Sequence, residues 1–414
     1  MMKMILRVAV AAAFALGFSQ AYAFHSGGVA ECAGCHQMHG APSPDFLLVA
    51  PDASSTCLSC HEHAGDTGPS SYHISTADAD LATAAPKQRT PGGDFGWLKR
   101  TYGTGTSAEL GQSHGHSIVA SANNYAADTT NVTAPGGGTM SSTALGCTSC
   151  HDQHSSIRRF ADGTYARTGL PISGSGSYNT SAEPIAGKTA VGVYRILRGG
   201  GAGIPADTFV SGASWANVFI ASAPSTYNRT EAVTQTRVAY GAGTGQWCNS
   251  CHPDMHGNTI AQGYHPVDQA INGLAANYNA YVSSGIMTGG AAPFTSLVPF
   301  AEPTLTAVQL KTHAQNNDSF LAGPASGDQV TCMSCHRAHA SGFLHAARWQ
   351  LENEFLTKAD SSGNAVYCST DGTPGERCAL NRTNAEVTAA YYDRPATKLG
   401  AYQRQLCNKC HAKD

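Results

Sequence analysis

Twelve of the fourteen cysteines in this chain lie in six copies of one short motif, C-x-x-C-H. The two thiols of such a motif can form thioether bonds to a haem, and the histidine can ligate the haem iron. Paired cysteines at this spacing also build four-cysteine zinc sites, but zinc does not explain a histidine in every copy. The sequence therefore predicts six covalently attached c-type haems. The motifs are Cys32/Cys35/His36, Cys57/Cys60/His61, Cys147/Cys150/His151, Cys248/Cys251/His252, Cys332/Cys335/His336 and Cys407/Cys410/His411.

Each haem iron takes a second axial ligand on the face opposite its attachment histidine. The chain has 18 histidines, so the six attachment histidines leave twelve for six positions. Methionine is the other common ligand, but only eight are present and several lie near the amino terminus. We therefore expect histidine on both faces of every iron. The favoured second ligands are His25, His39, His116, His154, His313 and His339, with His73, His256 and His265 in reserve and His63, His114 and His345 as surface residues.

Three of the favoured histidines, His39, His154 and His339, recur at the spacing C-x-x-C-H-x-x-H. A side chain three positions after an attachment histidine stays near the same face of that haem. It cannot reach the opposite face, so we expect these three to ligate neighbouring haems and to hold adjacent haems in contact. His116 and His313 precede the third and fifth motifs and can approach from the other side.

Full axial ligation separates electron transfer from catalysis. An iron with both faces occupied exchanges electrons but has no open position for a substrate. No motif departs from the C-x-x-C-H pattern in the way that often marks a catalytic haem. The chain is therefore interpreted as an electron carrier and not as an enzyme. Two alternatives are a monomeric periplasmic electron shuttle and a multihaem reductase with its own substrate site.

Short, irregular elements are expected to position these motifs. The 414 residues include 45 Gly and 19 Pro, each of which costs about 1 to 3 kcal/mol inside a helix. We predict helical turns at the six motifs and over Gln350–Thr357, a few short strands, and coil elsewhere. With about 65 residues per haem, the predicted fold is a mostly irregular multihaem cytochrome. It wraps around a continuous stack of six haems, which forms the hydrophobic core.

The amino terminus has the pattern of a secretory leader. Lys3 and Arg7 precede an apolar run over residues 8–18, and an A-x-A cleavage signal follows at residues 21–23. We expect a signal peptide over residues 1–23 and a single hexahaem unit over residues 24–414, exported through the periplasm. No later stretch has the ~20 apolar residues needed to span a bilayer.

The charge balance excludes a nucleic-acid-binding role. Without residues 1–23 the chain has 23 basic and 28 acidic residues, and each haem adds two propionates. An acidic protein without a basic stripe does not attract a phosphate backbone.

Cys368 and Cys378 are the two cysteines outside the motifs. In an oxidising compartment we expect them to form a disulfide that closes a short loop. Its role would be structural, worth about 2 to 3 kcal/mol on the loop-entropy model.

Several stretches resemble one known family. They include "FHSGGVAEC", "HAGDTGPSSYHIST", "TPGGDFGW", "CTSCHDQH", "APSTYNRTEA", "SCHRAHASGF" and "AYQRQLCNKCHAKD". The likeness extends nearly from Phe24 to Asp414 and includes all six motifs in order. On these residues the chain is identified as a member of the OmcS-type outer-surface hexahaem c-type cytochromes. The loop between Cys368 and Cys378 is not expected in that family.

The resemblance implies a mostly coil fold, bis-histidine haems and an extracellular location. It also implies head-to-tail polymerisation into conductive filaments, or nanowires, that carry electrons to metal oxides, other cytochromes or partner cells. In the family the histidine equivalent to His39 ligates the fifth haem of the adjacent subunit, here the haem held by Cys332, Cys335 and His336. From the residues alone, the alternative is that His39 ligates the second haem of its own chain.

Overall fold

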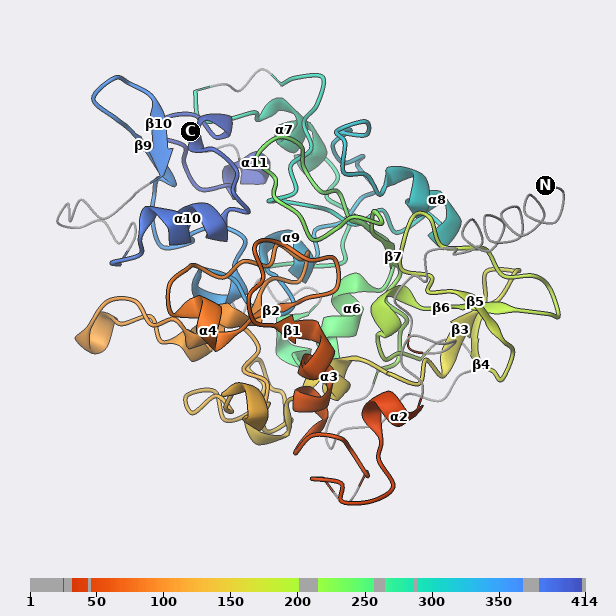
Figure 1. The fold of residues 1–414 in the computed structure, drawn as a ribbon. Helices are drawn as coiled ribbons and strands as arrows, with labels where there is room; N and C mark the ends of the chain where they lie inside the picture. Colours follow the sequence, from red (N-terminus) through yellow and green to blue (C-terminus); the bar gives the residue numbers. More distant parts are fainter. Residues whose placement is uncertain are drawn as a thin grey trace, which may run out of the picture.

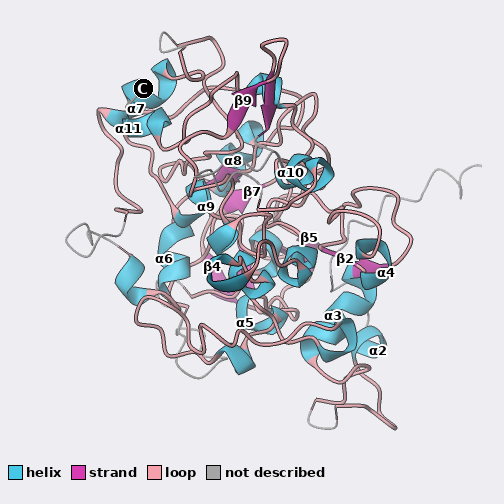
Figure 2. Cartoon of the chain, turned by 90° about the vertical axis from the view of Figure 1, so that its left-hand side faces the viewer, coloured by secondary structure: helices cyan, strands magenta, loops and turns pink. Residues whose placement is uncertain are grey.

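The computed structural model describes residue 25 and residues 32–43, 46–200, 215–256, 265–285, 289–367 and 380–411. Most of this chain is loop and turn, with short helices and strands between long irregular segments (Figures 1 and 2). The predicted mostly irregular fold is therefore confirmed. The expected leader over residues 1–23 and the expected Cys368–Cys378 disulfide lie outside the described residues.

A short helix accompanies every attachment motif, as predicted. These helices are α2 (Cys32–Cys35), α3 (Ala53–His61), α5 (Cys147–Cys150), α6 (Thr244–Asn249), α9 (Cys332–Cys335) and α11 (Asn408–His411). Four more lie in the connecting segments: α4 (Asp78–Leu81), α7 (Leu274–Ala280), α8 (Ala307–His313) and α10 (Asn384–Ala390). In the part of the chain that is described, no helix has the length and apolar character needed to cross a bilayer.

Polar side chains start several of these helices. Asp52 caps α3 by accepting a hydrogen bond from the backbone N–H of Ser55 at 2.7 Å. At α9, Thr331 accepts from Met333 N–H at 3.1 Å, and the hydroxyl of Ser334 accepts from Thr331 N–H at 3.0 Å. Such reciprocal caps satisfy the unpaired donors at a helix start. They fix the C-x-x-C turns locally, before any tertiary contact forms.

The strands form four small sheets. The largest has the order β4-β3-β6-β5, with antiparallel neighbours except for the parallel pair β5 and β6. The other sheets are the parallel pair β1 and β2 and the antiparallel pairs β7–β8 and β9–β10. The bounds are β1 (Glu62–His63), β2 (Ser75–Thr76), β3 (Ile157–Arg159), β4 (Tyr165–Arg167), β5 (Ile172–Gly174), β6 (Ala190–Gly192), β7 (Ala221–Ser222), β8 (Ala239–Tyr240), β9 (Thr357–Ala359) and β10 (Ala365–Tyr367).

The helix predicted over Gln350–Thr357 is wrong. This segment is irregular until its last residue, which begins β9. The side chain of Gln405 accounts for the difference, because its Nε2 donates to the backbone carbonyls of Gln350 at 3.0 Å and Leu351 at 2.6 Å. A side-chain amide thereby replaces the backbone hydrogen bonds that a helix would form.

The haem stack is not the whole hydrophobic core, contrary to expectation. One buried cluster joins Trp97 to residues of the last third of the chain, including Phe343, Trp349 and Tyr391. Trp97 and Trp349 are each 1% exposed. Burial of large aromatic side chains stabilises each by about 1.5 to 3 kcal/mol, so the chain also has an apolar core of its own.

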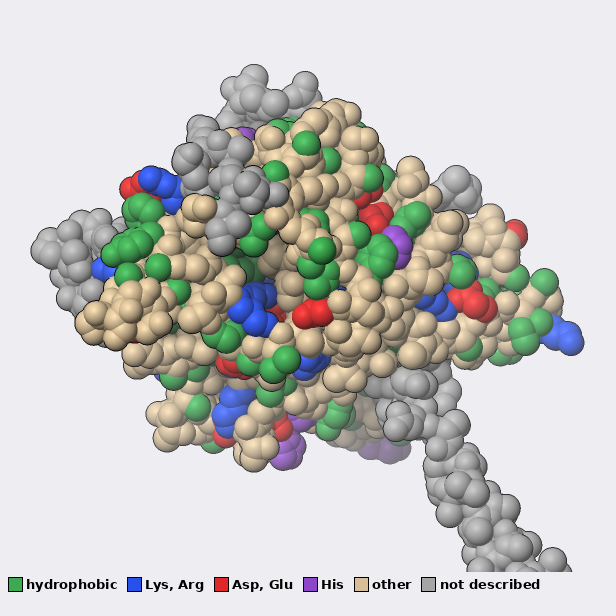
Figure 3. Space-filling model, turned by 90° about the horizontal axis from the view of Figure 1, so that it is seen from above, with side chains coloured by type: hydrophobic (Ala, Val, Ile, Leu, Met, Phe, Trp, Pro, Cys, Tyr) green, Lys and Arg blue, Asp and Glu red, His purple; other side chains and the backbone are tan. Residues whose placement is uncertain are grey.

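The molecular surface is mostly uncharged on the face seen from above (Figure 3). Lys and Arg side chains are interspersed there with Asp and Glu. That face therefore shows no continuous basic stripe among its coloured residues.

A fully buried carboxylate, Asp94, ties together the segments that follow the second attachment motif. It accepts from the N–H of Thr76 at 2.9 Å, the N–H of Gln88 at 2.9 Å and the N–H of Gly96 at 2.7 Å. Its side chain is inaccessible to solvent. Because β2 pairs with β1 directly after His61, these bonds also hold the second motif in place.

We expect Asp94→Ala to lower the free energy of unfolding by about 3 to 5 kcal/mol, because it leaves several buried donors without an acceptor. The measurement is the guanidinium midpoint of the haem-loaded protein. Asp360→Ala is the matched control: this carboxylate also accepts from two backbone N–H groups, at 2.9 and 2.8 Å, but in an exposed turn. Equal midpoints for the two variants would contradict the role assigned to Asp94.

Candidate haem-binding sites

The six attachment motifs follow one path through the molecule. In both Figure 1 and Figure 2, α2 lies at one end and α11 at the other, with α3, α6 and α9 between them. Thiols of consecutive motifs lie close enough to affect one another's pKa, which places neighbouring motifs side by side. The interacting thiols are Cys35 with Cys60, Cys57 with Cys147, Cys150 with Cys251, Cys248 with Cys332 and Cys335 with Cys407. The spatial order of the sites is thus the order of the sequence.

The twelve motif cysteines are all free of disulfide bonds. Each pair therefore remains available for two thioether bonds, as a c-type haem requires.

Five attachment histidines face a second imidazole, with nearly the same distance between ring centres in each pair. Metal–imidazole bonds are about 2.0 Å long, so two imidazoles that share one metal ion have ring centres roughly 6 Å apart. The observed separations fit that value. They are 6.5 Å for His36 and His154, 5.9 Å for His61 and His25, 6.4 Å for His151 and His339, 6.1 Å for His252 and His116, and 6.2 Å for His411 and His265.

The ring separation alone does not define a haem site. His63 and His73 also have ring centres 6.0 Å apart, but neither belongs to a C-x-x-C-H motif. His73 instead hydrogen-bonds through Nδ1 to Asp66 at 2.6 Å. A candidate haem site therefore needs both the cysteine pair and the facing imidazoles, and five motifs meet both conditions within one chain.

The fifth motif is the exception. All eighteen histidines lie in the described part of the chain, yet none has its ring opposite that of His336 in this arrangement. Conversely, His39 is exposed and faces no attachment histidine. One site lacks a second imidazole, and two of the favoured ligands, His39 and His313, lack a site.

The odd-numbered motifs share a backbone strap that the sequence analysis missed. The straps are residues 46–49, 195–198 and 345–348. The first carbonyl of each strap accepts a hydrogen bond from Nδ1 of the attachment histidine, and the last N–H donates to the carbonyl of the second motif cysteine. The imidazole bonds are His36 to Phe46 at 2.8 Å, His151 to Arg195 at 2.8 Å and His336 to His345 at 2.7 Å. The backbone bonds run from Val49 to Cys35 at 3.0 Å, from Arg198 to Cys150 at 2.8 Å and from Arg348 to Cys335 at 2.8 Å.

The straps fix the chemical form of the imidazoles. A carbonyl accepts only, so Nδ1 carries the proton and Nε2 keeps the lone pair that binds a metal. His61 and His252 are held in the same way by the carbonyls of Tyr72 at 2.6 Å and Pro135 at 2.8 Å. Burial lowers the pKa of His151 to about 4 and that of His339 to about 3. Both rings are therefore neutral near pH 7, as metal binding requires.

One favoured candidate, His313, and one reserve candidate, His73, have other partners. His313 donates through Nδ1 to the carboxylate of Glu302 at 2.7 Å and stacks on Phe320 with ring centres 4.0 Å apart. His73, bound to Asp66, is the second. The reserve residue His265 faces His411 instead, whereas the reserve residue His256 bonds to Asp268 at 3.0 Å. No sequence signal distinguishes these cases, because the partner carboxylates lie at unrelated spacings.

Three histidines were predicted to lie on the surface; two of them are exposed and one is buried. His63 and His345 are exposed, as expected. His114 is not, because its side chain is 0% exposed and its ring stacks on Tyr102, with centres 5.6 Å apart. The surface prediction for His114 was wrong: Tyr102 and the neighbouring Glu109 enclose the ring.

The histidines of the C-x-x-C-H-x-x-H motifs connect the odd-numbered sites in sequence. The second histidine of the fifth motif, His339, faces the third attachment histidine, and that of the third motif, His154, faces the first. Each therefore reaches the preceding odd-numbered site and not its own. The spacing correctly predicted that His154 and His339 do not face their own attachment histidines, but each faces the site two places earlier in the series and not an adjacent one.

Comparison with known proteins gives one consistent result. A family model described as a doubled CXXCH motif matches residues 25–66. C-type cytochrome OmcS from Geobacter sulfurreducens is 50% identical over 436 residues, covering 100% of this chain and 99% of the relative. Two solved structures are similar along their whole length, the cryo-EM structure of OmcS nanowires, with a TM-score of 0.85, and an outer membrane cytochrome S filament, with 0.83, both from the same organism. Each is 49% identical and covers 94% of this chain and 100% of its own.

The strap conformation generates a prediction at His345, which is exposed and has a φ of 58°. A β-branched side chain at such a left-handed position costs about 1 to 3 kcal/mol, whereas glycine adopts it freely. We expect His345→Val to lower the guanidinium midpoint and His345→Gly to retain it. Because the native side chain is exposed, the difference reports the backbone. Identical midpoints for the Val and Gly variants would show that the fifth site does not need this conformation.

Proposed function

The chain belongs to the family of C-type cytochrome OmcS, and from that premise we propose that it carries electrons outside the cell, through six c-type haems, along a filament of its own copies. Haem iron supplies one-electron redox chemistry. The protein attaches the haems, ligates both faces of each iron and keeps the haems in one continuous series. It is an electron carrier and not an enzyme.

We propose the five facing imidazole pairs as axial ligands within one chain. The ligands opposite the attachment histidines would be His154 at the first site, His25 at the second, His339 at the third, His116 at the fourth and His265 at the sixth. The ring separations and the Nδ1 hydrogen bonds support this set, because both match what an iron between two imidazoles needs. His73 and His313 are left out, since carboxylates already hold their rings.

The observation that most supports a filament is that the fifth site lacks a second imidazole. His336 has no imidazole opposite it, although every histidine of the chain is described. In the odd-numbered series, His339 reaches the third site and His154 reaches the first. His39 is the equivalent residue of the first motif, so its counterpart would be the fifth site of the next copy. One coordination bond would then join the subunits and continue the haem series.

Exposed apolar side chains near His39 support the proposal that this surface contacts the next subunit. Met38 is 79% exposed, Phe46 is 66% exposed and Leu47 is 40% exposed. Contiguous apolar surface of this kind marks a contact site when it lies beside functional groups. It projects with α2 at one end of the molecule, where a head-to-tail neighbour would meet it (Figure 1).

The proposed location is the outer cell surface, reached through the periplasm by way of the leader over residues 1–23. The two alternatives from the sequence, a monomeric shuttle and a reductase, would both require a lone chain to be complete. A lone chain would leave the fifth site without its second imidazole. No specific observation favours either alternative.

The joint between subunits is tested by His39→Ala. We expect a secreted protein with six attached haems by mass spectrometry, because every attachment motif is intact. One haem should become high-spin in the electronic spectrum, and electron microscopy should show no filaments, because the fifth site loses its ligand from the neighbour.

His313→Ala is the matched control for this variant. It removes a histidine that a carboxylate already holds, so filaments and spin states should stay as in the unmodified protein. Normal filaments from His39→Ala would contradict the proposed coordination bond between subunits. Filament loss in both variants would show that His313 also takes part in assembly.

The assigned ligands are tested by exchanging imidazole for thioether. His154→Met and His339→Met should each keep six attached haems and raise the reduction potential of one haem, because methionine ligation favours the reduced iron. The two variants should affect different haems, the first and the third. A redox titration with six unchanged potentials would exclude the altered histidine as an axial ligand.

A further inference from the structure

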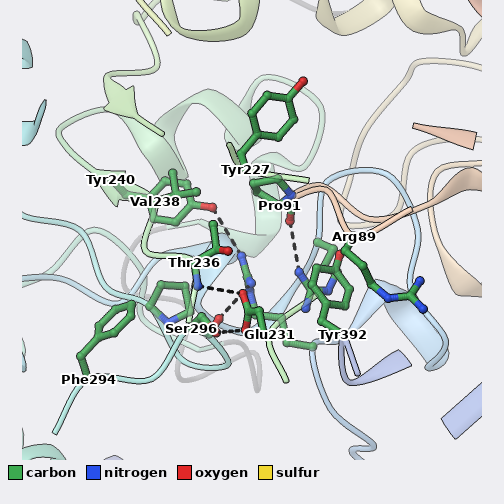
Figure 4. A pocket seen from close by; sticks show the side chains of 13 residues that line it. Arg89, Pro91, Tyr227, Glu231, Thr236, Val238, Tyr240, Phe294, Ser296 and Tyr392 are labelled. Carbon is green, nitrogen blue, oxygen red and sulfur yellow. Dashed lines mark hydrogen bonds between the residues drawn. The ribbon is translucent and has the colours of Figure 1, made fainter. Parts of the chain in front are cut away.

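A small cavity opens among segments that lie far apart in the sequence (Figure 4). Its wall includes the cations Arg89, Arg337 and Arg348. Arg89 is already neutralised, because it forms an ion pair with Asp393 at 3.0 Å. Its guanidinium points away from the cavity in Figure 4. The charges of the other two cations in the wall, Arg337 and Arg348, remain to be explained.

The one carboxylate in the wall does not neutralise them. Glu231 is bound by Arg394 and accepts from the hydroxyl of Ser296 at 2.5 Å. Arg337 and Arg348 form no ion pair with a carboxylate anywhere in the described ranges. The cavity wall thus carries an excess of two positive charges.

Arg337 is the less satisfied of these two cations. It is 4% exposed, and its guanidinium lies over the ring of Tyr392 at 3.6 Å. Its one hydrogen bond to a described residue goes to the carbonyl of Pro91 at 3.3 Å, and its Nε is buried without a partner. A buried cation without an anion is strongly unfavourable, so the burial of Arg337 without a paired carboxylate indicates that a counter-ion belongs beside it.

Arg348 adds charge without supplying an anion. It is also 4% exposed. Its Nε donates to the carbonyl of Met333 at 2.6 Å and its Nη1 to the carbonyl of Ser296 at 3.2 Å. Both acceptors are neutral, so the second positive charge also remains uncompensated.

The cavity lies near the third haem site through two of its wall residues. Pro91 precedes Gly92, where a Cβ atom would lie 3.1 Å from the ring of His339. The ring of Tyr227 packs on the guanidinium of Arg195 at 3.8 Å. The carbonyl of Arg195 holds His151. An acidic group at the edge of the third haem would therefore meet this cavity.

We propose that the cavity receives a propionate carboxylate of the haem at the third attachment motif, and that Arg337 pairs with it. This inference depends on the proposed haem ligation. Each haem carries two propionates, and a guanidinium binds a carboxylate through two parallel hydrogen bonds. Arg337 is then a positioning residue: it fixes one edge of the haem and, as a nearby positive charge, favours the reduced iron.

The test uses the full haem-loaded protein with its haem propionates labelled with ¹³C. Arg337→Gln should shift one propionate carboxylate band in the infrared spectrum. It should also lower the potential of one haem, by about 59 mV for a tenfold change in its reduction equilibrium. The affected haem should be the one that responds to His339→Met. Arg337→Lys keeps the charge, so it should restore the potential and still alter the carboxylate band, because lysine cannot bind as a fork.

Lys188→Gln controls for the loss of one positive charge, because Lys188 is exposed. It should change neither the band nor any potential. An Arg337→Gln protein whose carboxylate bands match those of this control would overturn the pairing. A potential shift at a haem other than the third would overturn the assignment to that haem.

Two further measurements separate the remaining explanations. Inorganic phosphate, titrated into the unmodified protein at constant ionic strength, should leave all six potentials unchanged. A phosphate-dependent shift would mean that the cavity binds an anion from solution and not a propionate. Haem content and filament formation, checked in parallel, test the proposed function. An unmodified protein without haems or filaments would contradict that function. Haems and filaments that are present, together with unchanged carboxylate bands in Arg337→Gln, would contradict only this inference. If Arg337→Gln does not mature, Arg337→Lys and the phosphate titration still decide the outcome.

Discussion

The pairing of each attachment imidazole with a second imidazole, proposed above as the ligation of the haem irons, is the constraint on which this structure depends. A C-x-x-C-H motif fixes one imidazole beside its own cysteines, so the other must come from elsewhere in the chain. His339 and His151 are separated by nearly half the chain, yet their ring centres lie 6.4 Å apart. Contacts of this kind replace regular secondary structure as the long-range organisers of the fold. They explain how a chain rich in glycine and proline can adopt one arrangement.

The protein contributes more than ligands to that arrangement. At three sites a strap with a residue at positive φ, Leu47, Arg195 or His345, turns its carbonyls toward the attachment motif. The same bonds set the proton on Nδ1 and leave Nε2 for the metal. An aromatic cluster around Trp97 and Trp349 packs the remaining segments. Metal ligation, strap geometry and apolar packing therefore act together, and none of them alone determines the fold.

The second histidines of the third and fifth motifs give the haem series a direction along the molecule. His154 and His339 each face the attachment histidine of the preceding odd-numbered site, so the two ends of the series differ. At the fifth site no histidine of the same chain faces His336. At the other end of the series, His39 is exposed and faces no attachment histidine. A directional series with complementary ends favours head-to-tail addition over a closed dimer, because a symmetric contact would pair like ends. Assembly and electron conduction then share the same groups.

The sequence by itself determined the cofactor, its number and its attachment residues, because thioether bonds require cysteines at a fixed spacing that any reader of the sequence can count. It also determined that His39, His154 and His339 cannot ligate their own haems, because three residues do not reach around a porphyrin. Short capped turns at the motifs followed from local residues such as Asp52 and Thr331. Only the tertiary structure decided that His265 and not His313 faces an attachment histidine, that His114 is buried, and that Gln350–Thr357 is not helical. Those outcomes depend on partners such as Glu302, Tyr102 and Gln405, whose spacings follow no repeating pattern, so only folding shows which side chains meet.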